Sequence, residues 1–233
     1  MRPWAPPWAG PARDRAPLVN AASTVDLIVL AGGRGSRLGG AVKPAVDVAG
    51  RTLLSRVLDA REFVRHVVIV GPAAARPAAG DGPALWALED PPFGGPVAGI
   101  AAGLDALGPT HPPAWVLVLA CDLPWAADAS RALLAAVADP TLPPEVQGLH
   151  LVDADGRAQW LTAAYRHDAL RSAVQRLGAR TRGASMRELV GSLALRGILD
   201  DTGAATDVDT WQDVSDSAAR LSGAPDSPRR TAE

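Results

Sequence analysis

The sequence has little cysteine, almost no excess charge and no long apolar run. Cys121 is the single cysteine of 233 residues, so no internal disulfide can form, which suits a reducing cytosol and predicts a cytoplasmic protein. Lysine and arginine number 23 against 25 acidic residues, so no basic excess indicates nucleic acid as a partner. No apolar run approaches the roughly 18 residues of a membrane span, and the start lacks the apolar core of a signal peptide. We therefore expect no membrane partner.

Both ends of the chain have too few apolar side chains to form part of a core. Residues 1–22 are rich in Pro, Ala and Arg, and residues 222–233 are polar with two prolines. Neither end can bury enough apolar surface to offset the entropy of ordering. We expect two disordered tails around a single domain at 23–221, which is long enough to bury a substantial core. A docking motif at Trp4 and Trp8 is the alternative for the first tail.

Strand-like and helix-like segments alternate through the middle of the chain. Near-continuous apolar, β-branched runs are typical of strands buried on both faces of a parallel sheet. They lie at residues 25–30, 66–71, 114–120 and, more weakly, 149–152, with helix-like segments at 52–63, 96–107, 127–138 and 167–178. This alternation predicts a three-layer α/β fold with a mostly parallel sheet. Ligands in such sheets bind at the carboxyl ends of the strands.

The segment LIVLAGGRGSRLGG, residues 27–40, joins the first apolar run to a glycine-rich loop. Backbone N–H groups of such a loop can surround a phosphate, and Arg34 and Arg37 add positive charge. The spacing Gly33-x-Gly35-x-x-x-Gly39 differs from the dinucleotide fingerprint, and no Gly-Lys-Ser/Thr closes the loop as in a P-loop. A phosphate-binding loop of another kind remains, with a plain glycine-rich turn as the alternative.

Several motifs recur in the order and spacing of a known family. They are Leu30-Ala31-Gly32-Gly33, Arg37-Leu38-Gly39-Gly40, Lys43-Pro44, EDPPFGGPVAGIAAGLDAL at 89–107, VLVLACDLPW at 116–125, QWLTAAYR at 159–166, RGASMRELV at 182–190 and TDVDTWQDV at 206–214. Together they cover about residues 25–215 and resemble the molybdenum cofactor guanylyltransferase-like NTP transferases. The resemblance implies a Rossmann-like fold of the nucleotide-diphospho-sugar transferase type.

The resemblance also implies an activity and a set of site residues. Relatives of this kind transfer GMP from GTP to the terminal phosphate of molybdopterin, release pyrophosphate and use Mg²⁺. The resemblance implies that Arg37, Lys43 and Asp122 are catalytic and that Asp122 binds the metal. It assigns nucleotide binding to Leu30, Ala31, Gly32, Gly33, Gly35, Arg37, Lys43, Asp90, Gly95 and Asp122. Cofactor-biosynthesis or acceptor enzymes would be transient partners.

The chemistry of nucleotidyl transfer suits these residue types. Both reactants are anions, so the site must supply cations and hold the reactants in line. Arg37 can bind phosphate oxygens bidentately and Lys43 as a point charge, while Arg34 fits a surface position better. A carboxylate at a strand end, as at Asp122, can carry Mg²⁺, and capping of the following helix is the alternative. Relatives often have Asp where this chain has Val42, which leaves the local support of the lysine open.

Other acidic residues leave alternatives open. The resemblance places Asp90 near the base or ribose and Gly95 in a loop over the nucleotide, although Asp90 also fits a plain turn. Asp207 and Asp209 would share one face of an extended segment, as a second metal or acceptor site requires, or would cap the last helix beside Thr210. Aspartates there are more common in cytidylyl-transferring relatives.

The sequence leaves three other functions open beside guanylyl transfer. The protein could transfer a cytidylyl group to the same acceptor, transfer a nucleotidyl group to a sugar 1-phosphate, or be a non-catalytic nucleotide-binding accessory protein. The histidines at 66, 111, 150 and 167 show no ligand spacing. We expect Cys121 to be a packed, unreactive thiol.

Overall fold

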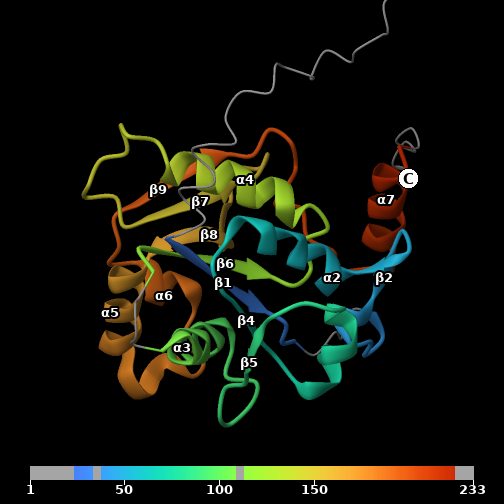
Figure 1. The fold of residues 1–233 in the computed structure, drawn as a ribbon, viewed down its shortest axis with the longest axis horizontal. Coiled ribbons are helices and arrows are strands. Elements are labelled where there is room, and N and C mark those ends of the chain that lie inside the picture. The colour runs from blue at the N-terminus through green and yellow to red at the C-terminus, as the bar shows by residue number, and fades with distance from the viewer. Residues whose placement is uncertain (1–23, 34–37, 109–112, 224–233) are drawn as a thin grey trace, which may run out of the picture.

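A seven-stranded sheet forms the centre of the computed structural model, which describes residues 24–33, 38–108 and 113–223 (Figure 1). Its strands are β1 (Val25–Leu30), β4 (Val67–Val70), β5 (Leu85–Ala87), β6 (Trp115–Ala120), β7 (Gly148–Val152), β8 (Ala158–Arg166) and β9 (Leu195–Leu199). The strand order is β5-β4-β1-β6-β8-β7-β9. Every neighbouring pair is parallel except the two that involve β8. The expected mostly parallel sheet is therefore confirmed.

Helices cover both faces of the sheet and make three layers (Figure 1). They are α2 (Leu53–Val57), α3 (Pro96–Leu107), α4 (Ala126–Val137), α5 (His167–Leu177), α6 (Met186–Val190) and α7 (Trp211–Leu221), with 3-10 turns η2 (Lys43–Ala45), η3 (Leu58–Phe63), η4 (Ala73–Ala79) and η5 (Gly178–Thr181). Successive side chains of a strand point to opposite faces. Leu27 and Val29 thus pack with α2 and α4, whereas Ile28 packs with α3 and α5.

Helix α3 lies close against β1 because two of its buried positions are glycine. A Cβ at Gly103 would lie 2.8 Å from a side-chain carbon of Ile28, and one at Gly99 would lie 3.0 Å from Leu30. Carbon atoms at these separations overlap, so a larger residue would push the helix outward. The two glycines place the N-terminus of α3 at the carboxyl end of β1.

The last helix and a small hairpin make a separate core beside the main sheet. The strands β2 (Asp47–Val48) and β3 (Arg51–Thr52) form the hairpin, and α7 packs next to it (Figure 1). The buried residues of this core are Leu38, Val46, Val48, Leu53 and Val208. Thr210 starts α7 with a capping box, in which its side chain accepts from the Asp213 N–H and Asp213 accepts in return. This core joins the C-terminal segment to the loop after β1.

The expected strands and helices agree with the structure to within about two residues, with two exceptions. The helix expected at 52–63 begins at Leu53, because Thr52 belongs to β3, and it continues as a 3-10 turn after Val57. The sequence patterns also did not predict α6, the sheet strands β5, β8 and β9, or the two short strands at Asp47–Val48 and Arg51–Thr52. The five residues between β7 and β8 are too few for a crossover, so β8 must run antiparallel. In the described part of the chain, no helix is long and apolar enough to span a bilayer.

Candidate functional site

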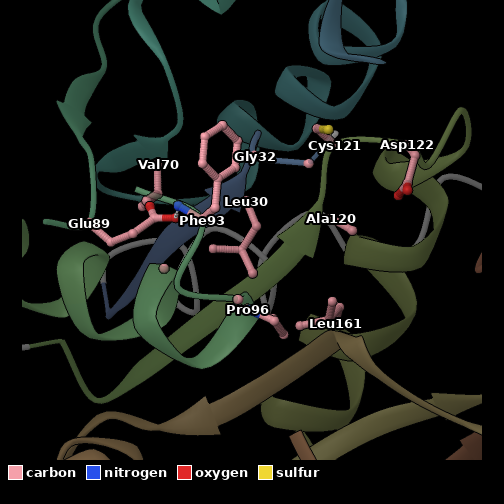
Figure 2. Close-up of a pocket in the computed structure, with 13 residues that line it drawn as sticks. Leu30, Gly32, Val70, Glu89, Phe93, Pro96, Ala120, Cys121, Asp122 and Leu161 are labelled. Atoms are coloured by element: carbon pink, nitrogen blue, oxygen red, sulfur yellow. Dashed lines mark hydrogen bonds between the residues drawn. The ribbon is translucent and has the colours of Figure 1, made fainter. Parts of the chain in front are cut away.

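The main candidate site is a cavity of about 440 Å³ at the carboxyl ends of β1 and β6 (Figure 2). The sheet order reverses between these two strands, which is where α/β sheets bind ligands. The described lining residues are Leu30, Gly32, Gly33, Val70, Glu89, Phe93, Gly95, Pro96, Gly99, Ala120, Cys121, Asp122 and Leu161. The walls are mainly apolar, and the two carboxylates of this set, Glu89 and Asp122, stand on opposite sides of the view in Figure 2.

Lys43 links Asp122, which lines the cavity, to Asp209, which lies next to it and is not among the lining residues. Its Nζ lies 2.6 Å from Asp122 Oδ2 and 2.5 Å from Asp209 Oδ1. The side chains are 12%, 16% and 38% exposed, so water screens these ion pairs only in part. Burial opposes the charged ammonium, but the contacts with Asp122 and Asp209 outweigh it and raise the pKa of Lys43. Lys43 is therefore a fixed positive charge at neutral pH.

Val208 holds Asp207 and Asp209 in position. Its N–H donates to the Asp122 carbonyl over 3.0 Å, and its side chain is fully buried in the small core. Because neighbouring side chains on an extended segment alternate, Asp207 and Asp209 both point away from that core. Carboxylate oxygens of Asp122, Asp207 and Asp209 lie within 4.8 Å of one another, and we call these three residues the acidic cluster.

The acidic cluster suits a divalent cation. Asp122 Oδ1 is buried and makes no hydrogen bond within the described residues, which leaves a carboxylate oxygen without the partner that burial normally requires. Desolvation and repulsion from Asp122 and Asp209 raise the pKa of Asp207. Mg²⁺ binds through carboxylate oxygens and would offset this negative charge. The unpaired Asp122 Oδ1 and the combined negative charge of the three carboxylates both favour a cation at this position.

Helix capping does not explain the predicted acids. The N-cap of α4 is Trp125 rather than Asp122, and no side chain caps that helix. At α7 the cap is Thr210, while Asp209 donates its N–H to Asp213 and directs its carboxylate to Lys43. These two acids therefore face the site and not a helix end.

Only some of the nucleotide-binding residues predicted in the loop after β1 line the cavity. Leu30, Gly32 and Gly33 line the cavity, and Gly33 has a φ of 137°, which favours glycine. Ala31 is buried in the main core and donates its N–H to the Val70 carbonyl. The predictions for Gly35 and Arg37, and for Arg34 at the surface, lie outside the described residues.

The structure places Glu89 rather than Asp90 in the cavity. Glu89 and Asp90 both line a neighbouring depression, together with Asp105 and Arg182. Gly95 does line the cavity, with a φ of 90° just before α3. The sequence analysis did not single out Glu89, and the role of Asp90 in nucleotide binding stays a prediction.

Gly71 and Cys121, which follow β4 and β6, offer no reactive side chain to the site. A Cβ at Gly71 would lie 2.9 Å from the Ala31 carbonyl oxygen, so this strand end accepts no side chain. Burial, together with the charge of Asp122, raises the pKa of the Cys121 thiol and keeps it protonated. The described histidines take part in no cluster of possible metal ligands, and His111 lies outside the described residues.

The sheet order and the cavity at its switch point define an α/β domain of the nucleotide-diphospho-sugar transferase type. Within this class, the family model for the MobA-like NTP transferase domain matches residues 27–196. The chain belongs to the MobA-like NTP transferase family.

Comparisons with individual proteins agree with this family. The chain is 41% identical over 101 residues to molybdenum cofactor guanylyltransferase of Rhodopseudomonas palustris, covering 42% of this chain and 48% of that protein. It is 39% identical over 101 residues to the enzyme of the same name from Pseudomonas putida, covering 42% and 50%. The matched region thus spans about half the length of these curated relatives.

Two solved structures share the fold. Molybdopterin-guanine dinucleotide biosynthesis protein A of Archaeoglobus fulgidus superposes with a TM-score of 0.63 at 20% identity, covering 85% of this chain and 99% of that one. The 4-diphosphocytidyl-2C-methyl-D-erythritol synthase of Anaerococcus prevotii gives 0.62 at 13% identity, covering 86% and 99%. At these identities the likeness concerns the fold alone.

Proposed function

We propose that this protein transfers GMP from GTP to the terminal phosphate of a molybdopterin-type acceptor. The observation that carries the proposal is the Lys43 ammonium, held by Asp122 and Asp209 at one end of a cavity with apolar walls. Family membership and relatives named molybdenum cofactor guanylyltransferase support the choice of nucleotide and acceptor.

The cavity divides into a base side and a phosphate side. Leu30, Val70 and Gly99 form apolar walls that suit the faces of a nucleobase. Gly32 and Gly33 bring the backbone near the phosphates without the obstruction of a side chain. Lys43 binds phosphate oxygens as a point charge, and Arg37, which lies outside the described residues, stays our prediction for a second cation. GTP thus lies with its phosphates toward the acidic cluster.

The reaction is a displacement at the α-phosphorus. An oxygen of the acceptor phosphate forms a new bond to this atom while the bond to the β-phosphate oxygen breaks, and pyrophosphate leaves with that electron pair. Lys43 neutralises part of the charge on these oxygens and holds the reacting groups in line. Asp122, with Asp207 and Asp209, would hold Mg²⁺, which supplies charge neutralisation between phosphate groups when bound.

Asp122→Asn tests this assignment. With GTP, Mg²⁺ and a molybdopterin acceptor, we expect pyrophosphate release to fall on the order of a hundredfold to a thousandfold, because a charged group at the phosphates is lost. Full activity in Asp122→Asn would refute the mechanism. GTP binding by the wild type without turnover of any phosphorylated acceptor would show an accessory protein, and preference for CTP would show a cytidylyltransferase.

The matched control is Asp81→Asn. Asp81 is exposed and lies shortly before β5. It is therefore at the amino ends of the parallel strands, whereas the candidate site is at their carboxyl ends. We expect this variant to keep wild-type pyrophosphate release, so the comparison separates loss of the Asp122 charge from any general effect of an Asp→Asn change.

A further inference from the structure

Arg220, in the last turn of α7, lies on the segment that carries Asp122. Its guanidinium carbon is 3.8 Å from the centre of the Trp125 ring, which is within the range of a cation–π contact. Trp125 comes three residues after Asp122, in the turn that leads from β6 to α4. The ring is partly buried against the main core, so it gives the guanidinium a fixed surface to rest on.

The same guanidinium holds the segment that leads to Asp207. Arg220 Nη2 donates to the Thr202 carbonyl over 2.5 Å, and Nη1 donates to the Gly203 carbonyl over 3.3 Å. The Gly203 carbonyl also accepts the N–H of Thr206, the residue directly before Asp207, over 3.3 Å. An arginine can make these bonds and stack on a ring at once, because its N–H groups lie in the plane of the guanidinium.

Gly203 lets the guanidinium approach this closely. Its φ is 68°, and a Cβ there would lie 3.2 Å from Arg220 Nη1 and 3.3 Å from Thr206 Oγ1. The loop is closed from its other side by the Asp200 carboxylate, which accepts the N–H groups of Thr202, Ala204 and Ala205. The loop before Asp207 is thus internally bonded, and Arg220 fastens it to Trp125.

The acidic cluster needs such a fastening, because its members come from two distant segments and repel one another. The bond from the Val208 N–H to the Asp122 carbonyl is one link between these segments. We propose that Arg220 is a second link, a positioning residue that holds Asp207 and Asp209 at the distance from Asp122 that a divalent cation requires. This inference rests on the cation role that the proposed function gives to the acidic cluster.

Arg220 acts through its contacts and not through its charge. In the part of the chain that the structure describes, its guanidinium forms no ion pair with an acid of the cluster. The charges that change the pKa of Asp207 are those of Asp122, Asp209 and Lys43. The two modes of action predict opposite signs. Loss of a nearby positive charge would strengthen cation binding, whereas loss of a positioning contact weakens it.

The test is a titration of the otherwise ligand-free protein with Mn²⁺, with the free ion followed by electron paramagnetic resonance. In Arg220→Met, which keeps an apolar stem, we expect Mn²⁺ affinity to fall on the order of tenfold, the lower end of what the loss of outer support of metal ligands costs. Arg220→Lys keeps the charge without the planar group, and we expect a similar fall. Unchanged or tighter binding in Arg220→Met would overturn the inference, and wild-type affinity in Arg220→Lys would overturn the role of the planar group.

Arg166→Met is the matched control. Arg166 lies 4.7 Å from the centre of the Trp115 ring and donates to the Val146 carbonyl over 2.9 Å, so it makes the same two kinds of contact. Trp115 begins β6, whereas Asp122 follows the end of that strand. We expect both Arg→Met variants to lower the Tm and only Arg220→Met to weaken Mn²⁺ binding. An equal loss of Mn²⁺ affinity in Arg166→Met would show a general effect on the fold and overturn the inference.

A second readout needs no metal. Asp207→Asn removes repulsion within the acidic cluster, so we expect it to raise the Tm at pH 7. In the Arg220→Met background the acids are freer to move apart, and we expect this gain to be smaller. An equal gain in both backgrounds would overturn the positioning role.

The outcomes separate this inference from the proposed function. Mn²⁺ binding by the wild type that is absent, or unchanged in Asp122→Asn, would overturn the cation role of the acidic cluster, and the Tm comparison would then decide on Arg220 by itself. Mn²⁺ binding that depends on Asp122 and not on Arg220 would overturn only the positioning role.

Discussion

Replacement of Lys43 by methionine perturbs the centre of the candidate site. Methionine keeps the length of the apolar stem and removes the ammonium that lies between Asp122 and Asp209. The three carboxylates of the acidic cluster then stay within 4.8 Å of one another without this charge. We expect the folded state to lose stability, because each of these acids is left to repel the others.

The magnitude follows from partial burial. Exposed ion pairs contribute about 0–1 kcal/mol, and removal of one partner of a fully buried pair costs about 3–5 kcal/mol. The side chains here are 12%, 16% and 38% exposed, between these limits, so we expect a loss of about 1–3 kcal/mol. For a chain of this size, such a loss lowers the Tm by roughly 2–12 °C.

The pH dependence has a definite sign. The pKa of Lys43 is raised in the folded state, because its ion pairs outweigh the effect of burial. The stabilisation from such a group is complete below the ordinary lysine pKa and is lost only as the pH rises through the raised value. The protonation of Lys43 therefore contributes no pH dependence between about pH 6 and pH 9.

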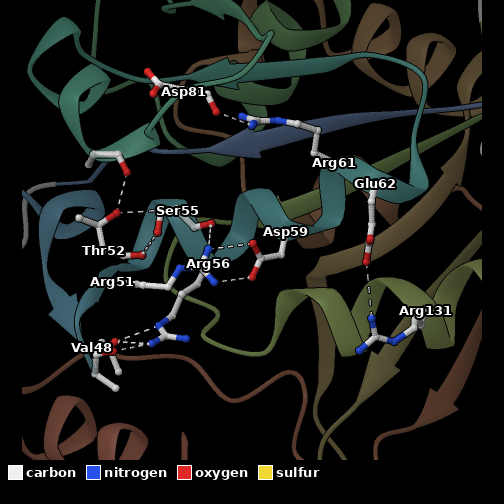
Figure 3. A network of polar contacts seen from close by, with 12 residues as sticks. Val48, Arg51, Thr52, Ser55, Arg56, Asp59, Arg61, Glu62, Asp81 and Arg131 are labelled. Carbon is white, nitrogen blue, oxygen red and sulfur yellow. Dashed lines mark hydrogen bonds and ion pairs between the residues drawn. The ribbon is translucent and has the colours of Figure 1, made fainter.

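Denaturant unfolding of a double-mutant cycle measures this interaction. The proteins are the wild type, Lys43→Met, Asp209→Asn and the double variant, at pH 7.5 and low salt. We expect a coupling free energy of about 0.5–2 kcal/mol, because the two groups are in direct contact. Arg51→Met is the control: it removes an exposed pair with Asp59 (Figure 3), in which both side chains are about half exposed, and should cost no more than about 1 kcal/mol. Strict additivity of the Lys43 and Asp209 changes would refute the reasoning.

Two further predictions concern neighbouring residues. Asp207→Asn should unfold at a higher temperature than the wild type at pH 7, because desolvation and the charges of Asp122 and Asp209 raise the pKa of Asp207 and make its ionised form costly. This gain should vanish below the ordinary carboxyl pKa, where the wild-type group is protonated in both states; a lower Tm at pH 7 would contradict it. Gly71→Ala should cost about 1–3 kcal/mol in denaturant unfolding, because the new Cβ would lie 2.9 Å from the Ala31 carbonyl oxygen, and an unchanged midpoint would show that the strand end adjusts freely.

Local patterns in the sequence were enough to find the parallel centre of the sheet. The runs that form β1, β4 and β6 are almost wholly buried, and a strand covered on both faces needs apolar residues at every position. The same reasoning located Asp122 directly after β6 and a glycine loop after β1. It did not find β8, whose first half is only partly buried and whose antiparallel direction follows from a short connection.

The sequence by itself determined the order of strands and loops, the family motifs, and which residues with useful chemistry follow each strand. Only the tertiary structure decided their partners. Lys43 and Asp209 are 166 positions apart and meet because the small core buries Val208 and packs α7 beside the hairpin. Glu89 lines the cavity, whereas Asp90 lines only the neighbouring depression, which Glu89 shares. Burial and periodicity are local and can be predicted from residue types, whereas side-chain direction and long-range contact depend on how the elements pack.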